Sequence, residues 1–527
     1  MPSIRFYDRA LAQLSRRDLL KVAWWLGVSA LAPAVTTRRL LAQPIFSDYP
    51  FSLGVASGDP TPDGVVLWTR LAPDPLHGGG MGADAVEVRW EIADEEGFYS
   101  IVQTGTTVAR PELGHSVHVE VSGLQPGREY WYRFRAGAEA TIPARTKTAP
   151  PEGAPVDRLR FGVCGCQHWE EGYFTAQQHI ADEYFDFVFY TGDYIYEQRA
   201  DNGRTLSPVR QHLGREVFTL GDYRTRYAQY RTDRHLRAAH ASAPLVISWD
   251  DHEVADDYAG ATDDRDTPAE LFLLRRAAAY QAFYEAMPLR ASAFPRGTDM
   301  RIYRGLKFGN LIDLSVLDTR QFRSNQACDS GNKSNCADAS LAARTMMGPE
   351  QERWLSTQLT GARATWTVIG QQVPTFSHDI IKVNPEGRYS MDRWDGYAAA
   401  RARLYTQLVE TKAPNPIVLS GDVHNHYGAD LKLDFTDTRS RTVGVEFTNT
   451  SITSDGDGGE TNGNWHRTRA DNPHIRFHSS LRGYIACTAT QQAMRADFKV
   501  VDRVSVPDSP VRVGGSLVVE AGRPGTA

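Results

Sequence analysis

Four stretches of the sequence place metal-binding side chains directly after an apolar run typical of a buried strand. The side chains are carboxylates, imidazoles, a phenol and a thiol, and each of these can act as a metal ligand. The stretches are residues 159–166, which lead into CQHW, FDFVFYTGDYIYE from residue 185, PLVISWDDHE from residue 244 and NPIVLSGDVHNH from residue 415. Their spacing over the chain predicts a site assembled by the fold rather than by one local motif.

The elements that must position these side chains are the strands of an α/β sheet. Ligands of such sheets bind outside the carboxyl ends of the strands, so we expect the four ends to meet in one crevice. Carboxylates with imidazoles suit divalent or trivalent cations, and two cations about 3.5–4 Å apart can clamp both oxygens of a phosphoryl transfer. Taken singly, a Gly-Asp pair is often a turn, and an Asp-His pair can be a surface loop or a helix N-cap. The recurrence of the pattern favours a metal-dependent phosphoesterase.

The composition indicates an ordered globular protein. The chain has 527 residues, of which 41% are apolar and 23% charged, and it is long enough for two or more domains. A net charge of -6 and a pI near 6.2 give no broad positive surface for a polyanion, so no nucleic-acid complex is expected. A small phosphorylated substrate fits this charge.

The pattern of the chain predicts two domains. Residues 46–150 consist of short alternating segments separated by Gly, Pro and Asp, which is typical of an all-β sandwich. A proline-rich linker follows at residues 148–155. Residues 156–510 alternate apolar strands with helical segments and predict a layered α/β domain, and residues 511–527 are expected to form a C-terminal tail or a closing strand.

The first residues resemble an export signal. Residues 1–42 contain SRRDLLK, with Arg16 and Arg17, before a short apolar run, which is the pattern of the twin-arginine pathway for folded proteins. A membrane anchor is the alternative, but the run is shorter than the roughly 20 residues that span a bilayer. Cleavage could follow Ala34 or Ala42. We therefore expect the Tat translocase to deliver a periplasmic or secreted protein without a membrane span after cleavage.

The five cysteines have different expected roles. Cys328 and Cys336 bracket the polar loop CDSGNKSNC, which a disulfide could close in an oxidising compartment. Cys164, Cys166 and Cys487 remain, and this odd number leaves at least one thiol outside any disulfide within the chain.

A series of motifs resembles the PhoD-like alkaline phosphatases over nearly the whole chain after the signal. Residues 118–136 are similar to the end of a fibronectin type III domain. The later motifs are GVASGDP, CQHW, TGDYIYE, WDDHE, LDTRQFR, GQQVP, SGDVH and EFTNTSIT. The resemblance implies an αββα calcineurin-like metallophosphoesterase domain after a fibronectin type III-like β domain. It also implies phosphomonoesterase or phosphodiesterase activity outside the cytoplasm, with Fe3+ and Ca2+ as the metals.

The resemblance also implies ligands for the ferric ion. By motif position, Asp193 would bridge two metals, Tyr196 would bind Fe3+ through its phenolate as in the similar purple acid phosphatases, and Cys166 would bind it through its thiolate. A buried inert thiol and a disulfide with Cys487 are the alternatives for Cys166. Cys164 is expected to have a structural role.

The third and fourth stretches supply the remaining residues that the resemblance implies. Asp251 would be a ligand where related enzymes have asparagine before histidine, and His252 would be the catalytic residue that stabilises or protonates the leaving oxygen. Asp250 would lie behind the ligands. Asp422 and His424 would complete the metal shell.

Two further residues, His426 and Arg320, each have alternative interpretations. His426 departs from the family and is only a possible ligand. Arg320, in LDTR, could contact the substrate phosphate because a guanidinium fits its paired oxygens, and a surface ion pair is the alternative.

Two rival functions follow from the same sequence. One is a phosphodiesterase or phospholipase D that acts on teichoic acid or lipid with the same site. The other is a surface-binding protein led by its β-sandwich, with an inert α/β part. The second rival is disfavoured because an inert descendant has no need for the complete ligand set, which comprises Asp193, Tyr196, Asp251, His252, Asp422 and His424.

Overall fold

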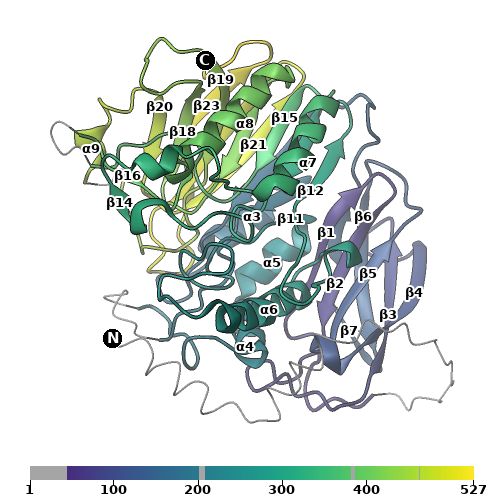
Figure 1. Ribbon diagram of the computed structural model, residues 1–527. Coiled ribbons are helices and arrows are strands. Elements are labelled where there is room, and N and C mark those ends of the chain that lie inside the picture. Colours follow the sequence, from purple (N-terminus) through teal and green to yellow (C-terminus); the bar gives the residue numbers. More distant parts are fainter. Residues whose placement is uncertain (1–43, 201–207, 382–385, 462) are drawn as a thin grey trace.

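Two large sheets pack face to face in the α/β part of the protein, with helices on both outer faces and a smaller β domain at one side (Figure 1). The computed structural model describes residues 44–200, 208–381, 386–461 and 463–527. The predicted twin-arginine segment lies outside the described residues. The predicted αββα sandwich preceded by a β domain is confirmed.

The first sheet has nine strands and carries three of the parallel strands predicted to end at the site. Strands β9, β10 and β11 run parallel to one another, so their carboxyl ends share one edge. The strand order is β23 (Val511–Glu520), β22 (Ala493–Val501), β21 (Gly483–Thr490), β9 (Arg158–Cys164), β10 (Phe187–Tyr190), β11 (Leu245–Ile247), β1 (Val55–Thr61), β2 (Gly64–Arg70) and β5 (Ser116–Val121).

The second sheet has seven strands, and its central members are also parallel. Its inner face meets the first sheet in an aromatic and aliphatic core that includes Phe161, Phe189, Trp366 and Phe447. The strand order is β12 (Arg304–Phe308), β13 (Ile312–Val316), β15 (Trp366–Gly370), β17 (Ile417–Ser420), β19 (Thr442–Thr448), β18 (His426–Lys432) and β20 (Ile475–Ser479). Since buried parallel strands need both faces covered, helices occupy the outer faces.

Helices α7 and α8 cover the second sheet, and α3 to α6 pack on the first (Figure 1). Local signals set their ends: Thr219 and Asp222 form a capping box at α4, and Asp233 caps α5. The bounds are α3 (Thr175–Asp182), α4 (Leu220–Arg231), α5 (Arg234–Ser242), α6 (Ala269–Ala286), α7 (Gly348–Gly361), α8 (Ala398–Glu410) and α9 (Trp465–Thr468). Short 3-10 turns are η1 (Pro111–Leu113), η2 (Ala291–Ala293), η3 (Ala327–Asp329), η4 (Ala337–Ser340) and η5 (Trp394–Tyr397).

The N-terminal β domain shares a sheet with the α/β part, which the sequence did not predict. Strands β1, β2 and β5 extend the nine-stranded sheet, because Gly58 of β1 lies beside Leu245 of β11. A Cβ at Gly58 would lie 2.5 Å from the carbonyl oxygen of Pro288, so glycine permits this close approach. The facing sheet consists of β3 (Val86–Ala93), β4 (Ile101–Ala109), β6 (Glu129–Ala136), β7 (Glu139–Ala140) and β8 (Ala144–Lys147).

The last residues form a strand of the α/β domain. Strand β23 pairs antiparallel with β22 from Val511 to Glu520, so the sheet extends beyond the boundary predicted at residue 510. Of the two expectations, a tail or a closing strand, the structure has the strand. Among the described residues, the helices are all too short or too polar to cross a membrane.

His118 ties the β domain to helix α6. Its Nε2 lies 2.9 Å from the carbonyl oxygens of both Tyr284 and Met287, and its ring stacks on the Tyr284 ring at a centroid distance of 4.4 Å. Burial lowers the pKa of His118 to about 4. Burial at this contact between the two parts of the protein therefore favours the neutral imidazole.

We predict that acid weakens this contact. The folded pKa lies below the unfolded value of about 6.5, so the stability from His118 is complete above pH 6.5 and declines as the pH falls towards 4. Between pH 7 and pH 5, this residue should cost about 2 kcal/mol of the free energy of unfolding. The variant His118→Gln should lose less stability over that interval, measured by urea unfolding at both pH values. Equal losses in the two proteins would contradict the linkage.

Candidate active site

The predicted ligands sit where the backbone leaves the strand ends in an unusual conformation. Cys166, Asp193, Asp422 and His424 have positive φ angles of 55°, 52°, 68° and 51°. Left-handed backbone is uncommon for residues other than glycine, and strained residues of this kind cluster at functional sites. The turns after β9, β10 and β17 thus direct ligand side chains to one edge.

Close packing explains why a glycine precedes three of these ligands. A Cβ at Gly165 would lie 2.3 Å from Oγ1 of Thr191, and a Cβ at Gly421 would lie 2.4 Å from the same atom. A Cβ at Gly192 would lie 2.4 Å from the backbone nitrogen of Asp250. The three strand ends can approach one another because side chains are missing at these positions.

The first group of candidate ligands combines a thiol, a carboxylate, an imidazole and a phenol. One ligand atom from each of Cys166, Asp193 and His424 lies within 4.8 Å of the others. The hydroxyl of Tyr196 donates to Oδ2 of Asp193 at 3.1 Å and lies 3.1 Å from Nε2 of His424. Ser454 donates to the same hydroxyl at 2.7 Å. Residues from the first, second and fourth stretches therefore meet at one place, as we expected from their positions at the ends of strands.

A second group of ligands consists of carboxylates and adjoins the first. Ligand atoms of Asp250, Asp251 and Asp422 lie within 4.8 Å of one another, and so do those of Asp193, Asp251 and His252. Asp193 belongs to both the thiol-containing group and the group with Asp251. This shared position suits a carboxylate that lies between two cations.

Arg320 lies among these carboxylates and is fully buried. Its Nη2 lies 2.9 Å from Asp422 and 3.3 Å from Asp251, and its Nη1 lies 2.9 Å from Asp392. Its Nε donates to Asp250. Each nitrogen of the Arg320 guanidinium thus has a carboxylate partner. The predicted contact of Arg320 with a substrate phosphate stays a prediction.

The electrostatics of the site fit bound cations. Burial, with the neighbouring carboxylates, raises the pKa of Asp193 and of Asp250 well above the usual range. Burial also raises the pKa values of the Cys166 thiol and the Tyr196 hydroxyl, and Asp193 adds to both shifts. Oδ2 of Asp250 is buried and has no hydrogen-bond partner. A nearby cation favours the ionised form of each group, so these residues fit metal ions.

His252 is held by a buried carboxylate that the prediction did not single out. Its Nδ1 lies 2.7 Å from Oε2 of Glu197, and its ring packs on Tyr196 at a centroid distance of 4.1 Å. Burial alone would lower the pKa of His252, but the carboxylates of Asp251, Glu197 and Asp193 raise it well above its usual range. The contacts with Glu197 and Tyr196 therefore fix the imidazole beside the carboxylate groups.

Three further carboxylates contact residues of the site. Glu253 lies in a motif found in the sequence, whereas no strand-end pattern pointed to Asp392. Glu253 accepts hydrogen bonds from the backbone nitrogens of Asp193 and Asp250 at 3.2 and 2.7 Å, and it ends the WDDHE motif. Asp455 lies 2.8 Å from Nδ1 of His424. Asp392 pairs with Arg320 but follows no long apolar strand, so the strand-end pattern gave no signal for it.

Both ring nitrogens of His426 contact the backbone, and His426 belongs to none of the groups of metal-binding side chains found among the described residues. Its Nδ1 accepts a hydrogen bond from the backbone nitrogen of Thr450, and its Nε2 lies 3.3 Å from the carbonyl oxygen of Lys499. The possible metal role kept open for it stays a prediction. Cys166 and Cys487 are both free thiols, which removes the disulfide alternative for Cys166.

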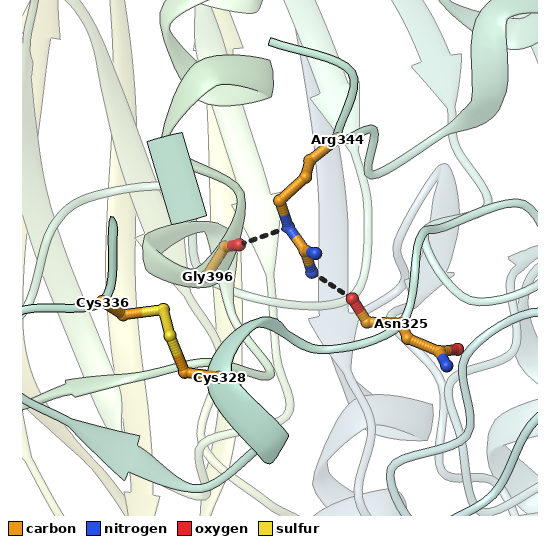
Figure 2. The surroundings of a disulfide bond; sticks show 5 residues. All are labelled: Asn325, Cys328, Cys336, Arg344 and Gly396. Carbon is orange, nitrogen blue, oxygen red and sulfur yellow. Dashed lines mark hydrogen bonds between the residues drawn. A yellow bond between two sulfur atoms is a disulfide. The ribbon is translucent and has the colours of Figure 1, made fainter. Parts of the chain in front are cut away.

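A disulfide loop braces one side of the site. The predicted bond between Cys328 and Cys336 is present, and Arg344 donates to the carbonyl oxygens of Asn325 and Gly396 beside it (Figure 2). The loop strand β14 (Asn332–Lys333) pairs with β16 (Tyr389–Ser390).

The braced segment leads directly into the site. Nε2 of Gln326, two residues before Cys328, donates to Oδ1 of Asp392 at 3.1 Å. The backbone nitrogen of Met391 donates to the carbonyl oxygen of Gly331 at 2.9 Å. The disulfide loop therefore helps to fix Asp392, which in turn holds Arg320.

The layered αββα sandwich, with side chains able to hold metal ions gathered at its strand ends, is the architecture of the metallophosphoesterase class. Residues 161–498 match the PhoD-like phosphatase family, and residues 36–150 match the PhoD-like phosphatase N-terminal domain. Alkaline phosphatase D of Bacillus subtilis (strain 168) is 46% identical over 496 residues, which cover 94% of this chain and 85% of that protein. A solved structure described as "Structure of PhoD" has a TM-score of 0.90 and 46% identity, and the match covers 92% of this chain and 93% of that one.

The chain therefore belongs to the PhoD-like phosphatase family, and its enzyme class is a hydrolase of the alkaline phosphatase D type.

Proposed function

We propose that the protein is an exported phosphatase that hydrolyses phosphate monoesters, and also diesters, by attack of water at a site that holds two kinds of metal. The observation that carries the proposal is the position of Asp193, which is shared between a thiol-containing group of ligands and a group with Asp251 and His252. A carboxylate in that position can bridge two metals, as two-metal phosphoryl transfer requires.

The two groups of donors differ in chemistry, which supports two different metals. Cys166, Tyr196 and His424 with Asp193 offer a thiolate, a phenolate and an imidazole, which suit Fe3+. Asp251 and Asp422 offer carboxylate oxygens, which suit Ca2+. When bound, such metals orient the phosphate, acidify water and offset the charge that develops in the transition state.

The residues of the chain then have separate tasks. His252, held through Nδ1 by Glu197, can give a proton to the leaving oxygen or stabilise it. Arg320 balances the carboxylates of Asp250 and Asp422, and its contact with substrate remains the expectation from the LDTR motif. Water attack needs no nucleophile from the protein.

We predict that the purified protein contains iron and absorbs visible light through charge transfer from Tyr196 or Cys166. Tyr196→Phe should shift or remove the band, whereas Tyr99→Phe, at a 94% exposed tyrosine of the β domain, should leave it unchanged. Removal of calcium with a selective chelator should abolish turnover and keep the band. Elemental analysis that finds zinc alone, with a colourless protein, would contradict the iron assignment, and turnover that survives calcium removal would contradict the calcium assignment.

We predict that His252 acts in the transition state and that Glu197 acts through it. His252→Ala should lower kcat by about 10^2–10^4-fold while metal content changes little. Glu197→Gln should cost about 10–100-fold and shift the acidic or basic limb of the pH–rate profile. The measurements are steady-state kinetics with a chromogenic phosphate ester and metal analysis of the same samples. A parallel loss of metal and activity would instead make His252 a ligand.

We predict that export depends on the first arginine pair of the sequence. Arg16→Lys with Arg17→Lys should keep active enzyme in the cytoplasm, because the twin-arginine pathway reads this pair and carries folded proteins. The matched control changes Arg38 and Arg39, a second pair in the same region, to lysine and should leave export intact. Full activity outside the cytoplasm for the first variant in cell fractionation would assign another route.

A further inference from the structure

A pocket beside the carboxylates of the candidate active site has no role in the steps described so far. Its volume is about 100 Å³, and the residues that line it include Arg393, Val423, Asn425, Tyr427 and Trp465. Val423 and Asn425 flank the candidate ligand His424 in the chain, so part of the pocket lining comes from the segment that follows the fourth strand end.

Arg393 connects the pocket to the ligand carboxylates. Its Nε lies 3.6 Å from Oδ2 of Asp422, and its side chain is 22% exposed. Arg320 contacts the same carboxylate but is fully buried and surrounded by carboxylates. Arg393 is therefore the arginine at this carboxylate that solvent and substrate can reach. A guanidinium in this place can pair with two oxygens of a phosphate.

The far wall of the pocket is aromatic and held rigid by stacking. Trp465 stacks on His478 with ring centroids 4.7 Å apart and an interplanar angle of 14°. Tyr427 packs on the same histidine at 4.9 Å and on His378 at 5.3 Å. Because these rings hold one another in place, the wall presents a fixed surface for the face of a bound ring.

The charges around the pocket disfavour a cationic occupant. Among the described residues, the lining contains no carboxylate, and Arg393 is its charged member. Burial, with the nearby Arg393, lowers the pKa of His378 well below its usual range, and burial lowers the pKa of His478 to about 4, so both rings are neutral at pH 7. A cationic group would meet the arginine without a counter-charge. The volume of about 100 Å³ is smaller than the roughly 150 Å³ of a buried cavity that encloses benzene, so a bound ring would lie partly in the pocket and partly in solvent.

We propose that Arg393 binds the phosphate of the substrate and that the adjoining pocket binds the alcohol part of the ester, with a preference for an uncharged ring over an acyclic or cationic group. The proposal rests on the phosphatase function and names the substrate class for that site. Arg393 and Trp465 then have separable tasks, one for the phosphate and one for the ring.

The test uses esters of primary alcohols, whose leaving groups react alike. The unchanged holoenzyme should hydrolyse glucose 6-phosphate with a higher kcat/KM than glycerol 3-phosphate, and phosphocholine should be the poorest of the three. Trp465→Ala should lower kcat/KM for glucose 6-phosphate about 5–10-fold and for glycerol 3-phosphate less than twofold, because only the ring loses a stacking partner. Arg393→Met should weaken inhibition by inorganic phosphate about 10–100-fold and affect the three esters alike, with partial rescue in Arg393→Lys.

Two controls keep the outcome interpretable. Tyr99→Ala removes an exposed aromatic side chain of the β domain and should change none of these values. Asn464→Trp fills the pocket from an exposed position and should remove the preference for the ring without disturbing the core, in case Trp465→Ala folds poorly.

The results separate the two proposals. An unchanged ratio between the sugar and glycerol esters in both pocket variants, with active parent enzyme, would overturn the pocket assignment and leave the phosphatase function standing. Unchanged phosphate inhibition in Arg393→Met would overturn the role of Arg393. A metal-loaded parent enzyme that hydrolyses none of the esters would overturn the proposed function and the inference with it.

Discussion

The repulsion among buried carboxylates is the constraint around which the α/β domain is organised. Several acidic side chains from distant parts of the chain occupy one water-poor crevice, and each raises the cost of ionising the others. Arg320 offsets part of this repulsion through direct contacts. The carboxylates are Asp193, Asp250, Asp251, Asp392 and Asp422. A fold that holds such a set must fix both the acids and their counter-charge.

The backbone at the strand ends meets that demand at a cost in strain. Asp193 and Asp422 each follow a glycine that lies close against Asp250 or Thr191. The φ angles of Asp193 and Asp422 are positive. Each such conformation costs on the order of 1–3 kcal/mol, which the packing of two large sheets must offset. The shared sheet between the two parts of the chain enlarges this scaffold, and the disulfide loop fixes the segment that carries Asp392. Rigidity is therefore concentrated where like charges are forced together.

The sequence predicted the elements that depend on local pattern. Apolar strands followed by Gly-Asp and Asp-His pairs located the strand ends, and the motif order located the family, because both signals lie within short segments. It could not predict Asp392, which is placed by the disulfide loop and by Arg320 rather than by a strand. The contacts of the His426 ring with Thr450 and Lys499 could not be predicted either, because they exist only in the folded chain. The roles of the clustered ligands stay predictions.

The two arginines at Asp422 illustrate how one carboxylate cluster can serve both stability and recognition. Both carry the same group, yet burial among acids commits Arg320 to charge balance, whereas partial exposure leaves Arg393 at the border with solvent. Sequence motifs cannot distinguish these situations, since exposure is set by the neighbouring elements. The buried arginine is bound by several acids and is difficult to replace without leaving charges uncompensated. Arg393 is partly exposed and has a single weak contact with the carboxylates, at Asp422. A change in the ester that binds at Arg393 can therefore leave the geometry of the candidate ligands unchanged.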